Sequence, residues 1–118
     1  MPFFTQVENS EDFKNILQNN RSWVIFKFTA TWCGPCKRAE PFISPWLHTL
    51  SEQGASIYIL DIDENFEIYG YLKKRRRLHG IPAILAYKSG NHDIIPDLFI
   101  SGTNPTEINT FFENMTRL

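Results

Sequence analysis

The chain has 118 residues, of which 42% are hydrophobic, 21% charged and 14% aromatic, and its formal net charge is −1. This length and composition predict one ordinary domain over residues 1–118, with enough apolar side chains for a core. The chain lacks the roughly 20 consecutive apolar residues of a membrane span, and its first residues lack the basic and apolar segments of a secretory signal, so we expect a cytoplasmic protein without membrane contact.

Strand and helix signals alternate along the chain. The strand signals are short apolar runs over residues 3–7, 23–29, 57–62, 82–87 and 94–100. The run at 23–29 is apolar on both faces, as is typical of a central strand that helices cover. Pro96 indicates that the last strand lies at a sheet edge, joined to 82–87 by a turn at 88–91.

The helix signals are apolar residues at helical spacing between capping residues. They cover residues 10–20, residues 33–54, a segment from 64 or 65 to 78, and a last segment that begins at 104. Ser10 is the predicted N-cap of the first helix. Asn104-Pro105-Thr106-Glu107 gives the last helix an N-cap, a proline at its first position and a glutamate at N3. Pro41 and Pro45 fall inside the second helix, where we expect a kink or break.

Both cysteines of the chain lie in Trp32-Cys33-Gly34-Pro35-Cys36, directly after the expected central strand. A disulfide across this spacing closes a very small loop, so it stabilises a fold poorly but can form and break reversibly. One thiolate attacks a partner's disulfide, and the second thiol then releases the reduced partner. A closed zinc site needs four protein ligands and there is no further cysteine, so the spacing favours redox chemistry over a metal.

The position of the two thiols predicts different roles for them. Cys33 is expected to open the second helix, where free N–H groups and the positive end of the helix dipole favour a thiolate. Cys36, one turn further on, should be shielded from solvent. Pro35 between them stiffens the turn and removes an N–H that the first turn leaves unpaired.

Several motifs together resemble the thioredoxin family over essentially the whole chain. They are residues 28–37, Pro41, Ile62-Asp63, Gly80-Ile81-Pro82, Lys88-Ser89-Gly90 and Gly102. The resemblance implies an α/β thioredoxin fold, with a central mixed sheet of four to five strands flanked on both faces by about four helices. It also implies a thiol-disulfide oxidoreductase that reduces protein disulfides, with Cys33 as the exposed nucleophile and Cys36 as the buried resolving thiol.

The resemblance further implies how partners would bind. Pro82 would be a cis proline that faces the substrate, leaving the N–H and C=O of Ile81 free to pair with an extended chain. Trp32, Gly34 and Pro35 would belong to the same surface, although Trp32 could instead fill space before the helix. We expect a monomer that has no bound cofactor. Its partners would be oxidised protein substrates, whose disulfides it reduces, and thioredoxin reductase, which would reduce it again with electrons from NADPH.

Lys27 departs from the family pattern. Alignment on the cysteines places it where thioredoxins have a buried acid that handles the proton of the resolving thiol, and Ile59 replaces the family's lysine on the neighbouring strand. A buried ammonium must be paired, lose its proton or reach solvent. Two carboxylates are candidate partners: Glu40, four residues after Cys36, and Asp61, on the same strand face as Ile59.

We therefore hypothesise a charge-inverted proton relay, in which Lys27 stabilises the Cys36 thiolate and Glu40 carries the proton. The alternative is that Lys27 extends past the strand end to solvent and that Glu40 is an ordinary surface residue. A positive charge beside the thiols favours their reduced form and makes the disulfide a stronger oxidant. Besides a reductase, the sequence thus leaves open an oxidase or isomerase, and also a binding module in which the thiols are dispensable.

The consecutive residues Lys73, Lys74, Arg75, Arg76 and Arg77 hold five of the twelve basic side chains, just before Gly80-Ile81-Pro82. We place this basic run at the end of the third helix, where cations beside the negative end of the dipole are the ordinary explanation. A second interpretation is a rim that selects acidic partners for the redox site. One short run in a slightly acidic chain is weak support for nucleic-acid binding.

Overall fold

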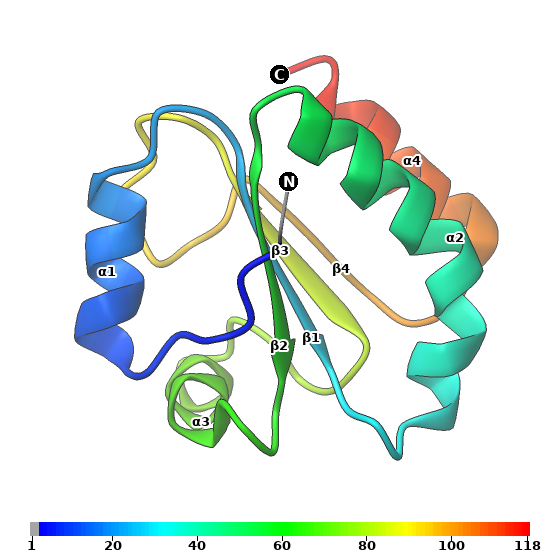
Figure 1. Ribbon diagram of the computed structural model, residues 1–118, viewed down its shortest axis with the longest axis horizontal. Helices are drawn as coiled ribbons and strands as arrows, with labels where there is room; N and C mark the ends of the chain where they lie inside the picture. The colour runs from blue at the N-terminus through cyan, green and yellow to red at the C-terminus, as the bar shows by residue number, and fades with distance from the viewer. Residues whose placement is uncertain (1–2) are drawn as a thin grey trace.

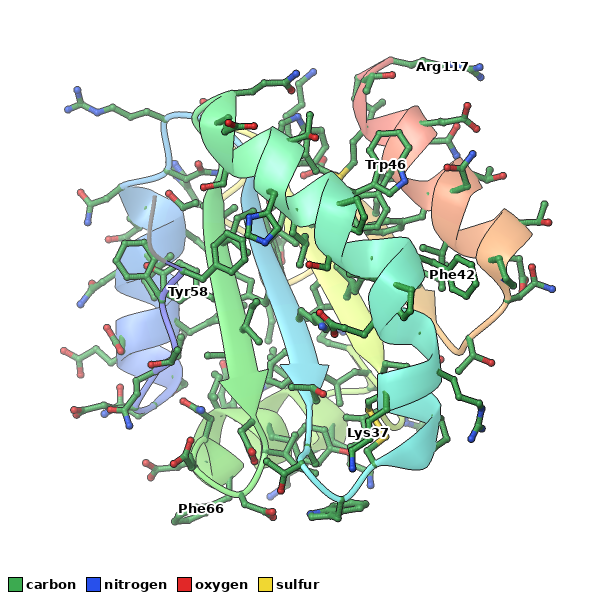
Figure 2. All side chains as sticks on the ribbon, turned by 45° about the vertical axis from the view of Figure 1, so that its right-hand side comes forward. Lys37, Phe42, Trp46, Tyr58, Phe66 and Arg117 are labelled. Atoms are coloured by element: carbon green, nitrogen blue, oxygen red, sulfur yellow. A yellow bond between two sulfur atoms is a disulfide. The ribbon has the colours of Figure 1, made fainter. Side chains whose placement is uncertain are left out.

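Residues 3–118 form a four-stranded mixed sheet covered by helices on both faces (Figure 1, and with side chains Figure 2), and these are the residues that the computed structural model describes. In chain order the elements are α1 (Ser10–Gln18), β1 (Val24–Thr29), α2 (Gly34–Glu52), β2 (Ser56–Asp61), α3 (Phe66–Lys74), β3 (Ala83–Tyr87), β4 (Leu98–Ser101) and α4 (Pro105–Met115). The strand order is β2-β1-β3-β4, with β1 parallel to β2 and antiparallel to β3. Figure 1 shows α1 and α3 on one face and α2 and α4 on the other. The predicted fold class is confirmed.

The core has two halves because β1 is buried on both faces. Phe26 and Phe28 pack into the cluster under α1 and α3, whereas Ile25 packs into the cluster under α2 and α4. Full burial of each such side chain stabilises the fold by roughly 1.5–3 kcal/mol. Alternation along the strand directs Lys27 to the same face as Ile25, toward α2.

Two details at the N-terminal side differ from the prediction. The first strand is reduced to a single bridge between Phe4 and Tyr58. The N-cap of α1 is Asn9 rather than Ser10, because the Asn9 side chain accepts a hydrogen bond of 2.9 Å from the Asp12 N–H. Asn9 thereby satisfies one of the N–H groups that the first helical turn leaves free.

The break expected in the second helix is absent, since α2 continues through Pro41 and Pro45 as one helix of 19 residues. Each proline removes one backbone hydrogen bond. The buried stripe of α2, which includes Ala39, Ile43 and Leu47, packs on the sheet along the whole helix. Tertiary packing therefore outweighs the local preference of the two prolines.

The third helix is shorter than predicted, because α3 ends at Lys74 instead of 78. The Arg77 N–H bonds to the Leu72 carbonyl at 2.9 Å and the Arg76 N–H to the Lys73 carbonyl at 3.0 Å, which is a Schellman ending. Arg76 sits there at a φ of 59°, in the left-handed region where glycine is usual. Only Lys73 and Lys74 of the basic run are helical, and its arginines form the following turn.

The last strand is also shorter than predicted, and Pro96 lies outside it. Residues 88–97 form a loop because its own side chains bond to its backbone: Asp97 accepts from the Lys88 N–H at 2.7 Å, and Asn91 donates to the Ile95 carbonyl at 3.0 Å. β4 is at the sheet edge, as expected. Across residues 3–118, none of the helices has both the length and the apolar character needed to span a bilayer.

Tyr87 connects this loop to the core and generates a prediction about alkaline stability. Its side chain is fully buried, its hydroxyl donates a hydrogen bond of 2.6 Å to the Ile94 carbonyl, and burial raises its pKa above the ordinary value of 10.0. Above about pH 10 the unfolded tyrosine ionises while the folded one stays neutral, so the free energy of unfolding should fall as pH rises.

We expect Tyr87→Phe to lower the free energy of unfolding by about 1 kcal/mol at pH 8, through loss of the hydrogen bond. The difference from the wild type should shrink between pH 10 and 11, because the variant lacks the group whose ionisation favours unfolding. Denaturant unfolding of both proteins at pH 8, 10 and 11 measures the difference in the free energy of unfolding. An unchanged difference would show that Tyr87 is not the group responsible.

Candidate active site

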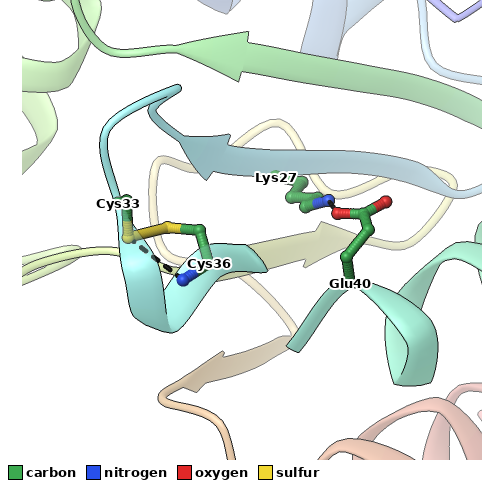
Figure 3. Close-up of polar contacts among 4 residues, drawn as sticks. All are labelled: Lys27, Cys33, Cys36 and Glu40. Atoms are coloured by element: carbon green, nitrogen blue, oxygen red, sulfur yellow. Dashed lines mark hydrogen bonds and ion pairs between the residues drawn. A yellow bond between two sulfur atoms is a disulfide. The ribbon is translucent and has the colours of Figure 1, made fainter. Parts of the chain in front are cut away.

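The two cysteines form a disulfide where the loop after β1 enters α2. Cys33 is the N-cap of α2, and its sulfur accepts a hydrogen bond of 3.1 Å from the Cys36 N–H (Figure 3). The Cα atoms of the pair are 5.3 Å apart. A sulfur in this position faces the free N–H groups and the positive end of the helix dipole, which would stabilise a thiolate after reduction.

Both cysteines are buried in this oxidised form. Cys33 is 4% exposed and Cys36 is 3% exposed, so the expected contrast between an exposed and a buried sulfur is not present. The bond to Cys36 holds Cys33 in a small apolar cluster with Ala30, against which Ile62 and Ile81 pack. The disulfide closes this cluster, which explains the difference from the prediction.

Pro82 follows a cis peptide bond from Ile81, as the resemblance implied. Antiparallel pairing of Ala83 with Phe28 brings this segment beside the loop that follows β1. The Pro82 carbonyl accepts from the Gly102 N–H at 3.1 Å. Among the described residues, no hydrogen bond uses the N–H or C=O of Ile81, so both groups are available to another chain.

Trp32 does not fill space in the core, because 64% of it is exposed. Its indole N–H donates a hydrogen bond of 2.8 Å to the Asp63 carboxylate, which holds the ring beside the disulfide. Gly34 and Pro35 are exposed in the first turn of α2. The structure therefore brings an exposed aromatic ring and a half-buried segment with unpaired backbone groups to the same disulfide.

Lys27 is paired with Glu40, and of the two candidate carboxylates Asp61 is not the partner. Asp61 instead accepts a hydrogen bond of 2.8 Å from the Asp63 N–H. Lys27 is 2% exposed, which rules out the alternative that its side chain reaches solvent, while the Glu40 side chain is 48% exposed. Figure 3 shows this ion pair between β1 and α2, with Cys36 on the side of the disulfide nearer to the pair.

Sequence reasoning assigned no role to Asp63, which it named only within the Ile62-Asp63 motif, or to Asn65; both residues follow β2. Asp63 positions Trp32, and the buried Asn65 side chain accepts from the Val7 N–H at 2.9 Å and donates to the Thr5 carbonyl at 3.1 Å. A signal existed, because parallel strands end at the same sheet edge, and polar residues after 57–62 therefore lie near those after 23–29. Within the described residues, no three His, Cys, Asp or Glu side chains gather closely enough to hold a metal.

A family model, curated relatives and a solved structure all match this chain to thioredoxins. A family model described as thioredoxin matches residues 4–114. Thioredoxin-1 of Schizosaccharomyces pombe is 33% identical over 103 residues, which cover 87% of this chain and 89% of that protein. Thioredoxin-2 of Saccharomyces cerevisiae is 29% identical over 104 residues, covering 88% of this chain and 90% of the relative. The crystal structure of thioredoxin from Trypanosoma brucei brucei is similar in fold, with a TM-score of 0.71 and 22% identity over 99% of this chain and 94% of that one.

The site geometry predicts unequal reactivity of the reduced thiols. We expect iodoacetamide at pH 7 to alkylate Cys33 at least about tenfold faster than Cys36, because only Cys33 occupies the helix N-cap, where a thiolate is favoured. Mass spectrometry of the digested protein measures the two rates. The Cys33→Ser variant should take up label only after unfolding, and equal labelling of both thiols in the folded protein would contradict this assignment.

Proposed function

The chain belongs to the thioredoxin family, and on this premise we propose a protein-disulfide reductase of the cytoplasm that thioredoxin reductase recharges with electrons from NADPH. The family's chemistry is thiol-disulfide exchange, it acts on protein disulfides, and it needs no bound cofactor. The redox-active group is the Cys33–Cys36 disulfide. The compartment is supported by the chain's having only these two cysteines, since small secreted domains usually carry more bridges.

The position of the Cys33 sulfur at the N-cap of α2 is the observation that carries the function. After reduction, the thiolate of Cys33 attacks one sulfur of the client disulfide, and the other client sulfur leaves with the electron pair and takes a proton. Cys36 then loses its proton and attacks the Cys33 sulfur, which releases the second client thiol. Two electrons and two protons pass to the client, and the Cys33–Cys36 bond is restored.

The free backbone groups of Ile81 support docking of the client as an extended segment. An extended chain that lies along Ile81 could bond to its N–H and C=O, as a strand added to a sheet edge does. Trp32, Gly34 and Pro35 would border the other side of the attacked disulfide. Because the backbone of the client makes these bonds, many client sequences would fit.

Cysteine variants test the function and its electron donor together. With thioredoxin reductase and NADPH, the wild type should support reduction of insulin, whereas Cys33→Ser should lose at least about 1,000-fold in rate because it lacks the nucleophile. Cys36→Ser should instead accumulate a covalent complex with the client through Cys33. Absorbance at 340 nm and non-reducing electrophoresis measure the two results.

Each failure in this experiment has a separate meaning. Reduction of insulin by the chemically reduced protein, but not with NADPH and the reductase, would overturn only the proposed donor. Failure of the wild type to reduce insulin, whether it is reduced chemically or by NADPH and the reductase, would overturn the reductase function itself. It would then favour a binding module that uses the same surface.

We also propose that the clients are acidic beside their cysteines. A cavity of about 280 Å³ lies between the end of the basic run and the loop before β4, lined by Arg76, Arg77, His79, Ile95, Pro96 and Phe99. These side chains are basic or apolar, so the cavity fits an acidic segment with an apolar residue. The cavity is close in sequence to the docking segment, since His79 directly precedes Gly80-Ile81-Pro82.

The strained backbone of Arg76 is a further reason to assign this cavity a role. An arginine at a φ of 59° costs roughly 1–2 kcal/mol relative to its usual conformation, and glycine would avoid that cost. The Schellman ending at this position places the Arg76 side chain in the cavity lining. Strained backbone conformations cluster at functional sites, which supports a role for the Arg76 side chain.

A pair of cyclic disulfide peptides tests the preference, one with two Glu and one with two Gln beside a cysteine. We expect kcat/KM to favour the Glu peptide, and Arg76→Asn to reduce that preference by about two- to fivefold, the usual strength of an exposed ion pair. Arg21→Asn removes the same charge from an exposed loop and serves as the control. If the ratio of kcat/KM for the Glu peptide to kcat/KM for the Gln peptide is the same in the wild type, Arg76→Asn and Arg21→Asn, the proposed selectivity is wrong. A preference for the Glu peptide that 0.5 M salt leaves unchanged would also overturn it.

A further inference from the structure

We propose that the buried Lys27–Glu40 ion pair acts on the resolving step, with the Lys27 ammonium stabilising the Cys36 thiolate and Glu40 passing the thiol proton to solvent. This inference rests on the proposed reductase function and assigns two residues to its second step. The resemblance implies an acid at position 27, so the polarity of the charge beside the thiol is inverted in this chain.

Glu40, the carboxylate that holds the Lys27 ammonium, lies one helical turn after Cys36. Cys36 and Glu40 are four residues apart in α2, so they share a face of the helix with about 5–6 Å between their Cβ atoms. That face looks toward β1, because Cys36 is buried and Lys27 of β1 bonds to Glu40. Figure 3 shows the ion pair beyond Cys36, on the side away from Cys33.

Burial makes this charge effective. Lys27 is the one charged side chain among residues 3–118 that is fully buried, and water therefore screens its field weakly. A buried ion pair is a poor source of stability, since apolar side chains of similar size often serve as well. Stability alone is therefore a weak reason for a lysine at the centre of β1, and a role for its charge is the better account.

The other charged groups near the cysteines differ in exposure or already have partners. On α2, Lys37 and Arg38 are exposed. After β2, Asp63 is bonded to Trp32 and Asp61 to the Asp63 backbone. On the β3 side, the segment that contacts the cysteines is Ile81, which carries no charge. Lys27 is thus the buried charge beside the thiols.

The exposure of Glu40 gives the proton a route out of the buried site. In the mixed disulfide, Cys36 is a thiol that must lose its proton before its sulfur can attack Cys33. The proton passes to Glu40, whose side chain is 48% exposed, and from there to solvent. The new Cys33–Cys36 bond forms as the client sulfur leaves with the electron pair, and the client thiolate takes up a proton from water.

The sign of the charge has a consequence for the redox equilibrium. An ammonium beside the thiols stabilises their ionised, reduced form, which makes the disulfide a stronger oxidant. Removing the ammonium should therefore make the pair more reducing at pH values where the thiolates are populated.

The first test is the titration of Cys36 by thiolate absorbance at 240 nm in proteins that carry Cys33→Ala. We expect Lys27→Met to make the Cys36 thiol at least about tenfold weaker as an acid, because the nearby positive charge is lost and Glu40 remains. Lys14→Met removes a charge of the same sign from the exposed face of α1 and should leave the titration unchanged. Identical titrations of the Lys27→Met and Lys27 proteins would overturn the proposal.

The exchange variant Lys27→Glu/Glu40→Lys separates an electrostatic role from a structural one. It keeps an ion pair between the same two positions but places the negative charge in the buried one. We expect folding stability near that of the wild type, while the Cys36 titration stays at the higher pH of Lys27→Met. A return of the titration to its wild-type position would show that only the presence of the pair matters, which would contradict the proposal.

The redox equilibrium gives an independent readout in proteins with both cysteines. Against a glutathione buffer at pH 8.5, Lys27→Met should shift the equilibrium constant at least about tenfold toward the disulfide, or about 30 mV for this two-electron couple. No shift, or a shift toward the dithiol, would count against the proposal. Loss of client reduction by the wild type would instead refute the reductase function, so the two failures are distinguishable.

Discussion

Burial of β1 on both faces is the constraint on which the rest of the structure depends. The strand supplies Ile25 to one half of the core and Phe26 and Phe28 to the other, so helices must cover both sides of the sheet. Its parallel neighbour β2 ends at the same edge, and α2 starts there with Cys33 as its N-cap. The redox site therefore lies where a rigid strand meets the positive end of a helix, and it needs no cavity of its own.

The same burial explains the polarity of the site. A lysine at the centre of β1 has no access to water, so its side chain is held by a carboxylate from the opposing helix. Glu40 can serve because it lies one turn after Cys36 on the helix face that packs on β1. In our proposal, two positive groups act on the cysteines: the dipole of α2 on Cys33 and the Lys27 ammonium on Cys36. Both favour thiolates, and both favour the dithiol over the disulfide.

Charge is distributed unevenly over the outer surface, although the chain as a whole is nearly neutral. The basic run ends α3 and continues as a turn, which residues 78–80 connect to Ile81, the segment that we propose docks the client. The turn is closed by a Schellman motif with an arginine in place of glycine, and the loop before β4 is braced by its own Asn and Asp side chains. Local hydrogen bonds therefore determine the shape of the basic turn after α3 and of the loop before β4, while the sheet determines how far both lie from the disulfide.

The sequence alone determined the order of the four helices and of β1 to β4, the central position of β1, the last helix with its Asn104 cap, and the cysteine pair, because each depends on spacing or capping within a short segment. The strand expected over 3–7 is only a single bridge. The sequence did not determine the ends of α3 and β4 or the continuity of α2 through two prolines. There, a Schellman ending, loop hydrogen bonds and packing on the sheet outweighed local preference. The sequence also left open whether Lys27 pairs with a carboxylate, loses its proton or reaches solvent, and it indicated no role for Asp63. Only the tertiary structure selected Glu40 over Asp61 and bonded Asp63 to Trp32, because both contacts join separate elements that come together only in the folded chain.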